Sequence, residues 1–192
     1  MNSIKKDHFL NYAEYLRKRS VISYYYRKYY LYPKISKPLK GLVLDVGCGI
    51  GDYLEFRKNT IGVDINPFLV DICKNKNLKS KLMKDDVLPF ETSHFEGVIF
   101  DNVLEHIKNP KKIILEIRRV LKKNHYLIVG VPGSLGYTMD NDHKVYYDKL
   151  ELKNLFENFG FKFKESYGMP IDFNFFEKIM RQYCLYARFE RI

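Results

Sequence analysis

The sequence lacks most features of secreted and membrane-spanning proteins. Only three of its 192 residues are cysteines, and Cys48, Cys73 and Cys184 are odd in number and widely spaced, which excludes a disulfide framework and a CxxC metal motif. The longest apolar stretches have about half a dozen residues, far below the ~18–20 that span a bilayer. The polar start, MNSIKKDHF, has no apolar segment of a secretory signal. We therefore expect a reduced, cytoplasmic protein without a transmembrane segment.

Acidic residues are scarce at the front of the chain. Residues 1–40 hold ten Lys and Arg against two Asp and Glu, a charge of +8 out of +10 for the whole chain. The same segment carries a cluster of tyrosines: Tyr24, Tyr25, Tyr26, Tyr29, Tyr30 and Tyr32. Such a basic, aromatic arm is typical of binding to an anionic partner such as nucleic acid, a phosphorylated molecule or a membrane surface. The alternative is a helix whose tyrosines pack on the rest of the protein.

The remaining residues alternate between strand-like and helix-like patterns. Strands are predicted at Leu42–Val46, Thr60–Val63, Lys81–Met83, Gly97–Phe100 and Tyr126–Val131, with further apolar segments at Phe161–Phe163 and Tyr183–Phe189. Helices are predicted at 51–57, 67–76, 110–122 and 148–158. This alternation indicates an α/β fold, with a doubly wound, mostly parallel sheet covered by helices on both faces. We divide the chain into a basic helical arm, residues 1–40, and one domain, residues 41–192.

The first predicted strand ends in a glycine-rich loop. Asp45 stands two residues before Gly47-Cys48-Gly49-Ile50-Gly51, and Asp64 ends the second strand. A carboxylate at that place can accept hydrogen bonds from the ribose hydroxyls of an adenosine-type cofactor. The glycines follow GxGxG and not the GxGxxG of dinucleotide sites, and the loop holds no basic residue and no GK[ST]. The loop therefore favours a zwitterionic ligand over a polyphosphate.

These motifs together resemble the class I S-adenosylmethionine-dependent methyltransferases, in particular small members with "LDVGCG" and "LEHI". The resemblance covers about residues 41–165 and includes Leu44–Gly51, Gly62–Ile65, Asp86–Phe90, Val103–Ile107, Arg119–Lys122 and Val131–Pro132. It implies a Rossmann-like, seven-stranded methyltransferase fold with S-adenosyl-L-methionine as the cofactor. It also implies that the segment before the first strand forms helices that cover the cofactor cleft.

The resemblance assigns cofactor-binding roles residue by residue. Asp45 and the loop of Gly47, Cys48, Gly49 and Gly51 would hold the methionine end, and the Asn102 backbone would bind its ammonium. Asp64 would bind the ribose and Ile65 would pack on the adenine. Asp85 or Asp86, with Val87 beside it, would accept from the adenine amino group, and the spacing leaves open which aspartate does so. The usual turn before the fifth strand is Lys123-Asn124-His125 here, where Asn tolerates a left-handed conformation.

Catalytic residues are harder to assign, because methyl transfer depends mainly on alignment. A general base helps when the acceptor is a hydroxyl, and His106 and His143 are the candidates, with a loop anchor and a polar turn as their respective alternatives. Some relatives hold Mg²⁺ with Glu-x-x-Glu-His, but this chain has Asn102-Val-Leu-Glu105-His106. Since a neutral ligand weakens a site for a hard cation, we expect no metal.

The sequence thus predicts a methyltransferase acting on a small or medium-sized metabolite, with an O- or N-acceptor on an anionic, sugar or lipid-linked substrate. The alternatives are an RNA methyltransferase and a non-catalytic cofactor-binding scaffold. Five basic residues of the arm would attract an anionic acceptor: Arg17, Lys18, Arg19, Arg27 and Lys28.

Overall fold

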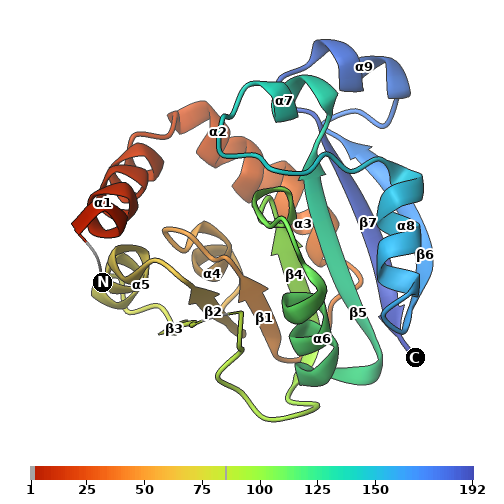
Figure 1. Ribbon diagram of the computed structural model, residues 1–192, viewed down its shortest axis with the longest axis horizontal. Helices are drawn as coiled ribbons and strands as arrows, with labels where there is room; N and C mark the ends of the chain where they lie inside the picture. The colour runs from red at the N-terminus through yellow and green to blue at the C-terminus, as the bar shows by residue number, and fades with distance from the viewer. Residues whose placement is uncertain (1–2, 85) are drawn as a thin grey trace.

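A seven-stranded sheet forms the centre of the computed structural model, which describes residues 3–84 and 86–192 (Figure 1). Its strands are β1 Val43–Val46, β2 Thr60–Asp64, β3 Ser80–Leu82, β4 Phe95–Asp101, β5 Leu121–Pro132, β6 Phe161–Met169 and β7 Cys184–Arg191. The strand order is β3-β2-β1-β4-β5-β7-β6. Strands β1 to β5 pair in parallel, and β7 runs antiparallel between β5 and β6. The predicted doubly wound, mostly parallel sheet is confirmed.

Alternating side chains of the central strands divide the core between the two faces of the sheet. Leu44 and Val46 belong to a cluster with helices α6, Lys111–Val120, and α8, Lys149–Glu157. Val43, between them in β1, instead packs with the arm and with α4, Asp52–Phe56. Because successive residues of a strand point to opposite faces, Asp45 must share the arm face with Val43. One carboxylate of the glycine-loop motif is therefore directed toward the arm.

The predicted helices of the domain agree with the structure to within two residues. Besides α4, α6 and α8, they include α5, Pro67–Asn75. Asn124 has the expected left-handed conformation, with φ of 60°, but it lies inside β5 and not in a turn before it, where the pairing with β4 shifts register between Leu121 and Tyr126. Three short helices had no sequence signal that we recognised: η2 Leu104–His106, α7 Ser134–Thr138 and α9 Asn174–Ile179. Within the described residues, no helix has the length and apolar character needed to cross a membrane.

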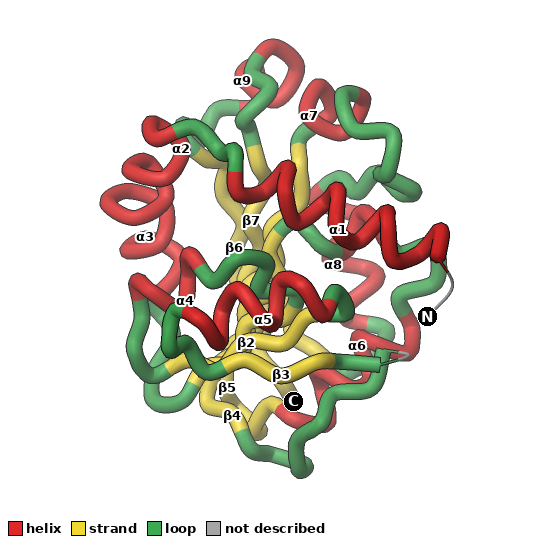
Figure 2. The backbone as a smooth tube through the Cα atoms, turned by 90° about the vertical axis from the view of Figure 1, so that its left-hand side faces the viewer, coloured by secondary structure: helices red, strands yellow, loops and turns green. Residues whose placement is uncertain are grey.

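The arm is helical, as predicted, and bends around the ends of the strands. It consists of α1 Ser3–Arg17, α2 Val21–Tyr26, the π-helix η1 Arg27–Leu31 and α3 Tyr32–Ser36. Figures 1 and 2 show α1 lying across α5 at the side to which the parallel strands point. There Ala13 and Leu16 form a buried cluster with Leu69 of α5. Further along, Ile35 is completely buried against the sheet, so the end of the arm belongs to the main core.

Helix α8 supplies a test of how local sequence stabilises the fold. Asp148 accepts a hydrogen bond from the Glu151 amide at 2.8 Å, and Glu151 accepts one from the Asp148 amide at 2.8 Å. Replacing an N-cap Asp by Ala typically costs about 1 kcal/mol. We expect Asp148→Ala to lower the free energy of unfolding in urea by about this amount. The exposed Asn154→Ala, in the same helix, should change it by less than about 0.5 kcal/mol, and equal effects of the two would contradict the cap's role.

Candidate functional site

The glycine loop after β1 is shaped by tight backbone contacts. The amides of Gly47 and Cys48 both donate to the Val63 carbonyl, at 2.8 and 3.0 Å. Gly47 has φ of 79°, and a Cβ atom there would overlap the Val103 side chain. The loop thus requires glycine at 47 both for its backbone conformation and for the close approach of the segment after β4. A ligand on this loop would meet backbone with little side chain in the way.

Asp64, at the end of β2, is only 7% exposed and already holds the loop in place. Its two carboxylate oxygens accept from the amides of Gly49, at 3.0 Å, and Asn66, at 2.9 Å. Burial raises the pKa of Asp64 to about 6. A carboxylate has about four acceptor positions, so two remain for the ribose hydroxyls predicted to bind here. The role of Asp64 toward the ribose stays a prediction that its position supports.

Asp45 lies deeper, on the arm face of the sheet. It is 5% exposed, and burial together with the nearby Asp101 raises its pKa well above the usual value. Asp101 accepts hydrogen bonds from the Tyr186 hydroxyl and from the side-chain Nδ2 of Asn102, both at 2.8 Å. The backbone N–H of Asn102 donates to the Gly130 carbonyl at 2.9 Å, which leaves the Asn102 carbonyl as the backbone group that an ammonium could reach. A buried acid beside such a carbonyl suits the cationic end of a zwitterion.

Two arginines of the arm point toward Asp52, the first residue of α4. Arg19 and Arg27 both lie on the Asp52 carboxylate, with Nη1–Oδ2 distances of 3.2 and 3.8 Å. Together with Leu16 and Ile50 they line a cavity of about 330 Å³ between the arm and the glycine loop. The sequence predicts that both arginines attract an anionic acceptor; in the structure both lie near Asp52, and their role toward an acceptor stays a prediction. Sequence reasoning missed Asp52 and Asp101 because neither belongs to a motif.

The adenine end of the predicted site is more open. Ile65 and Val87 are 50% and 47% exposed, unusual for apolar side chains in the loops beside a sheet edge. The amide of Met83 donates to the Asp64 carbonyl at 2.9 Å, which places the segment after β3 next to the end of β2. Asp86 has φ of 58° and lines an open pocket of about 470 Å³ near the start of α6. Asp85 lies outside the described residues.

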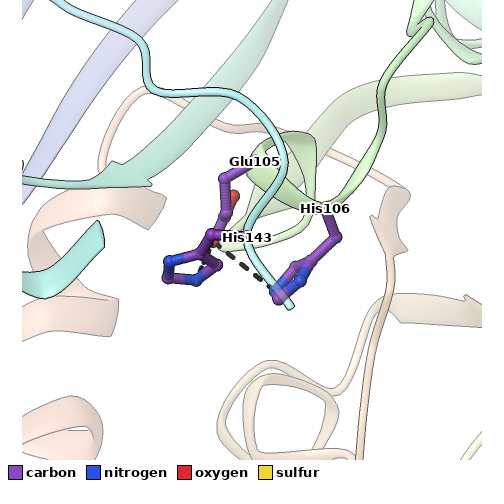
Figure 3. Close-up of side chains that lie close together, drawn as sticks. All are labelled: Glu105, His106 and His143. Carbon is purple, nitrogen blue, oxygen red and sulfur yellow. Dashed lines mark ion pairs between the residues drawn. The ribbon is translucent and has the colours of Figure 1, made fainter. Parts of the chain in front are cut away.

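Both predicted catalytic histidines meet at one point, together with Glu105 (Figure 3). The His106 and His143 rings have centroids 4.8 Å apart. Their Nε2 atoms lie 3.9 and 3.8 Å from the same Glu105 oxygen. Their Nδ1 atoms contact carbonyl oxygens, His106 that of Asp142 at 3.2 Å and His143 that of Tyr137 at 2.8 Å. Both rings are therefore fixed with the Nε2 atom toward Glu105.

Glu105 is the least satisfied charged group among the described residues of this edge. It is 1% exposed, and neither carboxylate oxygen has a hydrogen-bond partner. Burial raises its pKa to about 8, and burial lowers the pKa of His106. Its backbone carbonyl accepts from the Lys144 and Val145 amides at 2.7 and 3.1 Å, which fixes the His143 loop against η2. Such a group can take up a proton from an acceptor, and our sequence reasoning quoted Glu105 without selecting it.

The cluster of Glu105, His106 and His143 belongs to the same edge as the glycine loop. Val103 contacts Gly47, and Glu105 follows two residues later. The nine-residue segment after β4 therefore connects the predicted methionine end with the predicted base. Of the predicted positions, the structure brings the loop, Asp45, Asp64 and Asn102 to this edge. It leaves Asp86 beside α6, at the periphery.

Comparison with known proteins also indicates a methyltransferase. A family model described as "Methyltransferase domain" matches residues 12–166. Two Methanocaldococcus jannaschii proteins, MJ1123 and MJ0638, are 31% and 38% identical over 125 and 128 residues, covering 64% and 63% of this chain. The chain spans just over half the length of these relatives, 58% and 55%. The Xenopus tropicalis tRNA (carboxymethyluridine(34)-5-O)-methyltransferase alkbh8 is 33% identical over 52% of this chain and 18% of its own length.

Solved structures share the fold at low identity. A chain of the complex between the Haloferax volcanii Trm112 methyltransferase activator and a methyltransferase superimposes with a TM-score of 0.74 at 16% identity, covering 95% of this chain and 96% of that one. A SAM dependent methyltransferase from Aquifex aeolicus has a TM-score of 0.66 at 17% identity, covering 88% and 93%. The α/β architecture with seven strands is thus shared over nearly the whole chain.

The buried state of Asp64 predicts a pH dependence of stability. Because its folded pKa is raised to about 6 from 3.8, the folded protein holds the proton more tightly than the unfolded chain. Asp64 therefore contributes a loss of stability as pH rises from about 4 to about 6, of at most about 3 kcal/mol. We expect Asp64→Asn to remove this part of the slope when urea unfolding is measured across that window. Exposed Asp71→Asn is the control; a slope unchanged in Asp64→Asn would contradict the argument.

Proposed function

Because this chain belongs to the class I S-adenosylmethionine-dependent methyltransferases, we propose that it methylates a hydroxyl oxygen, with Glu105 and His143 receiving the hydroxyl proton. The observation that carries this proposal is the cluster of Glu105, His106 and His143. A buried carboxylate without partners beside two oriented imidazoles is costly to fold. Such a cluster can take up the proton that a hydroxyl acceptor loses during methyl transfer.

The cofactor would supply an electrophilic methyl group on a sulfonium, and the acceptor would supply the hydroxyl oxygen that takes this group. Asp45, Asn102 and the glycine loop would hold the methionine end, and Asp64 the ribose. Ile65 and Val87 would cover the adenine. The acceptor proton would pass to His143 Nε2, or to Glu105 in its ionised form, which a pKa of about 8 makes the minor form at neutral pH. Alignment of the acceptor oxygen with the methyl group and the sulfur can lower the barrier by roughly 7–11 kcal/mol.

For the acceptor we favour RNA over the anionic metabolite that composition alone suggested. Tyr25 and Tyr29 of the arm are 52% and 67% exposed and lie parallel, at 10° and 5.9 Å between ring centroids. Lys28 stands beside them, 5.6 Å from the Tyr29 ring. Exposed aromatic rings with a neighbouring cation suit nucleotide bases and phosphates. The name of the Xenopus relative, a tRNA methyltransferase, supports the same class.

The cofactor part of the proposal is tested by Asp64→Ala. Two hydrogen bonds from ribose to a carboxylate are worth roughly 1.5–3 kcal/mol each, so we expect S-adenosylmethionine to bind at least tenfold more weakly by calorimetry. Asp71→Ala, on the exposed face of α5, should bind normally. Unchanged affinity in a folded Asp64→Ala protein, or preference of the wild type for NAD, would overturn the assignment.

The acceptor part is tested by transfer of labelled methyl groups to bulk tRNA, with RNase-treated extract as the comparison. Loss of base stacking costs about 1–3 kcal/mol per base, so Tyr25→Ala with Lys28→Ala should raise KM for RNA about tenfold. Cofactor affinity should stay the same. Tyr15→Ala with Lys6→Ala removes the same two residue types from the exposed side of α1 and should leave KM unchanged. Label in small molecules of extract that was never exposed to RNase, with none in the RNA, would favour the metabolite.

A further inference from the structure

We propose that Glu105, His106 and His143 bind a divalent transition-metal ion of the zinc type. One carboxylate oxygen and two imidazole nitrogens offer ligand atoms that all lie within 4.8 Å of one another (Figure 3). The ion's part in methyl transfer rests on the proposed function, whereas its binding does not. This inference replaces our sequence-based expectation that the chain holds no metal.

The separations suit a single ion. Ligands at ~2.0–2.1 Å from a tetrahedral zinc ion stand ~3.3–3.4 Å apart. The two Nε2–Oε1 distances here are 3.8 and 3.9 Å. Closing these two distances requires about half an ångström each, and the widest separation among the three ligand atoms, up to 4.8 Å, requires about 1.5 Å. Side-chain rotation can supply both. The carboxylate can move, because no hydrogen bond holds either of its oxygens.

The hydrogen bonds on the outer sides of the rings point to a cation in the middle. A carbonyl oxygen can only accept, so each Nδ1 carries the proton that contacts the carbonyl of Asp142 or Tyr137. The two Nε2 lone pairs then face the Glu105 carboxyl group, an arrangement that repels unless a proton or a metal ion lies between them. Metal-binding histidines are oriented by the same kind of N–H···O=C contact. The structure thus contains the ligands and also the groups that orient them.

The types of ligand atom favour a zinc-type ion over Mg²⁺. Asn102, which stands where some relatives have a further glutamate, is turned away: its Nδ2 donates to Asp101 at 2.8 Å, and its Oδ1 accepts from the Cys184 thiol at 3.6 Å. Mg²⁺ prefers oxygen ligands and octahedral geometry, whereas imidazoles suit zinc and its neighbours. Asp140, 3.9 Å from His143 Nε2, has a side chain 45% exposed. Three protein ligands leave a position for water or an acceptor hydroxyl, whose pKa the ion would lower. With the ion bound, His143 Nε2 is a ligand, and the proton of the hydroxyl would go to the second Glu105 oxygen or to solvent.

The test is binding of Zn²⁺ and Co²⁺ to chelator-treated, full-length protein. Calorimetry with Zn²⁺ should give one site per chain, and Co²⁺ should give visible absorption typical of low coordination. Glu105→Gln and His143→Ala should each weaken Zn²⁺ binding at least tenfold. Excess Mg²⁺ should not displace Co²⁺. The control is His125→Ala, which removes an exposed histidine whose Nδ1 also contacts a carbonyl, that of Lys123 at 2.9 Å.

Several results would overturn the proposal. One is absence of Zn²⁺ binding, which would mean that a protonated histidine neutralises Glu105. Another is binding that survives both variants while their circular dichroism shows a folded protein. A third is a thiolate-to-cobalt band, which would move the ion to Cys48 and Cys73. Methyl transfer is measured separately: Zn²⁺ binding without transfer leaves the metal site intact and removes the proposed function, and full transfer in chelator removes the ion's role.

Discussion

Burial of carboxylates at one edge of the sheet is the constraint on which the rest of this structure depends. Asp45, Asp64, Asp101 and Glu105 are all largely removed from water where β1, β2 and β4 end. A buried ionised acid must be paired, hydrogen-bonded or protonated. Asp64 is stabilised by two amides and Asp101 by Tyr186 and Asn102. Glu105 has no such partner, so it must hold a proton, in keeping with its pKa of about 8, or be compensated by what binds at this edge.

The arm supplies part of that compensation, and this explains why its composition was misleading. Arg19 and Arg27 offset Asp52, and both lower the pKa of Asp101, which burial raises. Tyr32 is buried in the core, while Tyr25 and Tyr29 face solvent. A net charge of +8 over residues 1–40 therefore contains at least two populations of basic residues. Composition counts them together, and only packing separates those that hold the fold from those free to meet a ligand.

The sequence predicted the parts of the structure that depend on neighbours in the chain. The left-handed conformation of Asn124 and the bounds of α5 and α6 depend on nearby residues, and each agrees with its prediction. The helices α7 and α9 were missed because five and six residues are too few to show a helical periodicity. The pairing of His143 with Glu105 was beyond reach, because 38 residues separate them. Their meeting depends on the Lys144 and Val145 amides bonding to the Glu105 carbonyl, which no spacing encodes.

Helix α1 links the two halves of the candidate site. Near its start, His8 pairs with Asp142 at 3.4 Å, and the Asp142 carbonyl orients His106. One residue later, the Phe9 carbonyl accepts from Asn66 Nδ2 at 2.8 Å, and the Asn66 amide donates to Asp64. Asn66 thus connects α1 to the carboxylate predicted to bind the ribose, and Asp142 connects α1 to the ring of His106. Because the two contacts come from neighbouring residues of one helix, the predicted ribose site and the Glu105 cluster depend on the same placement of α1.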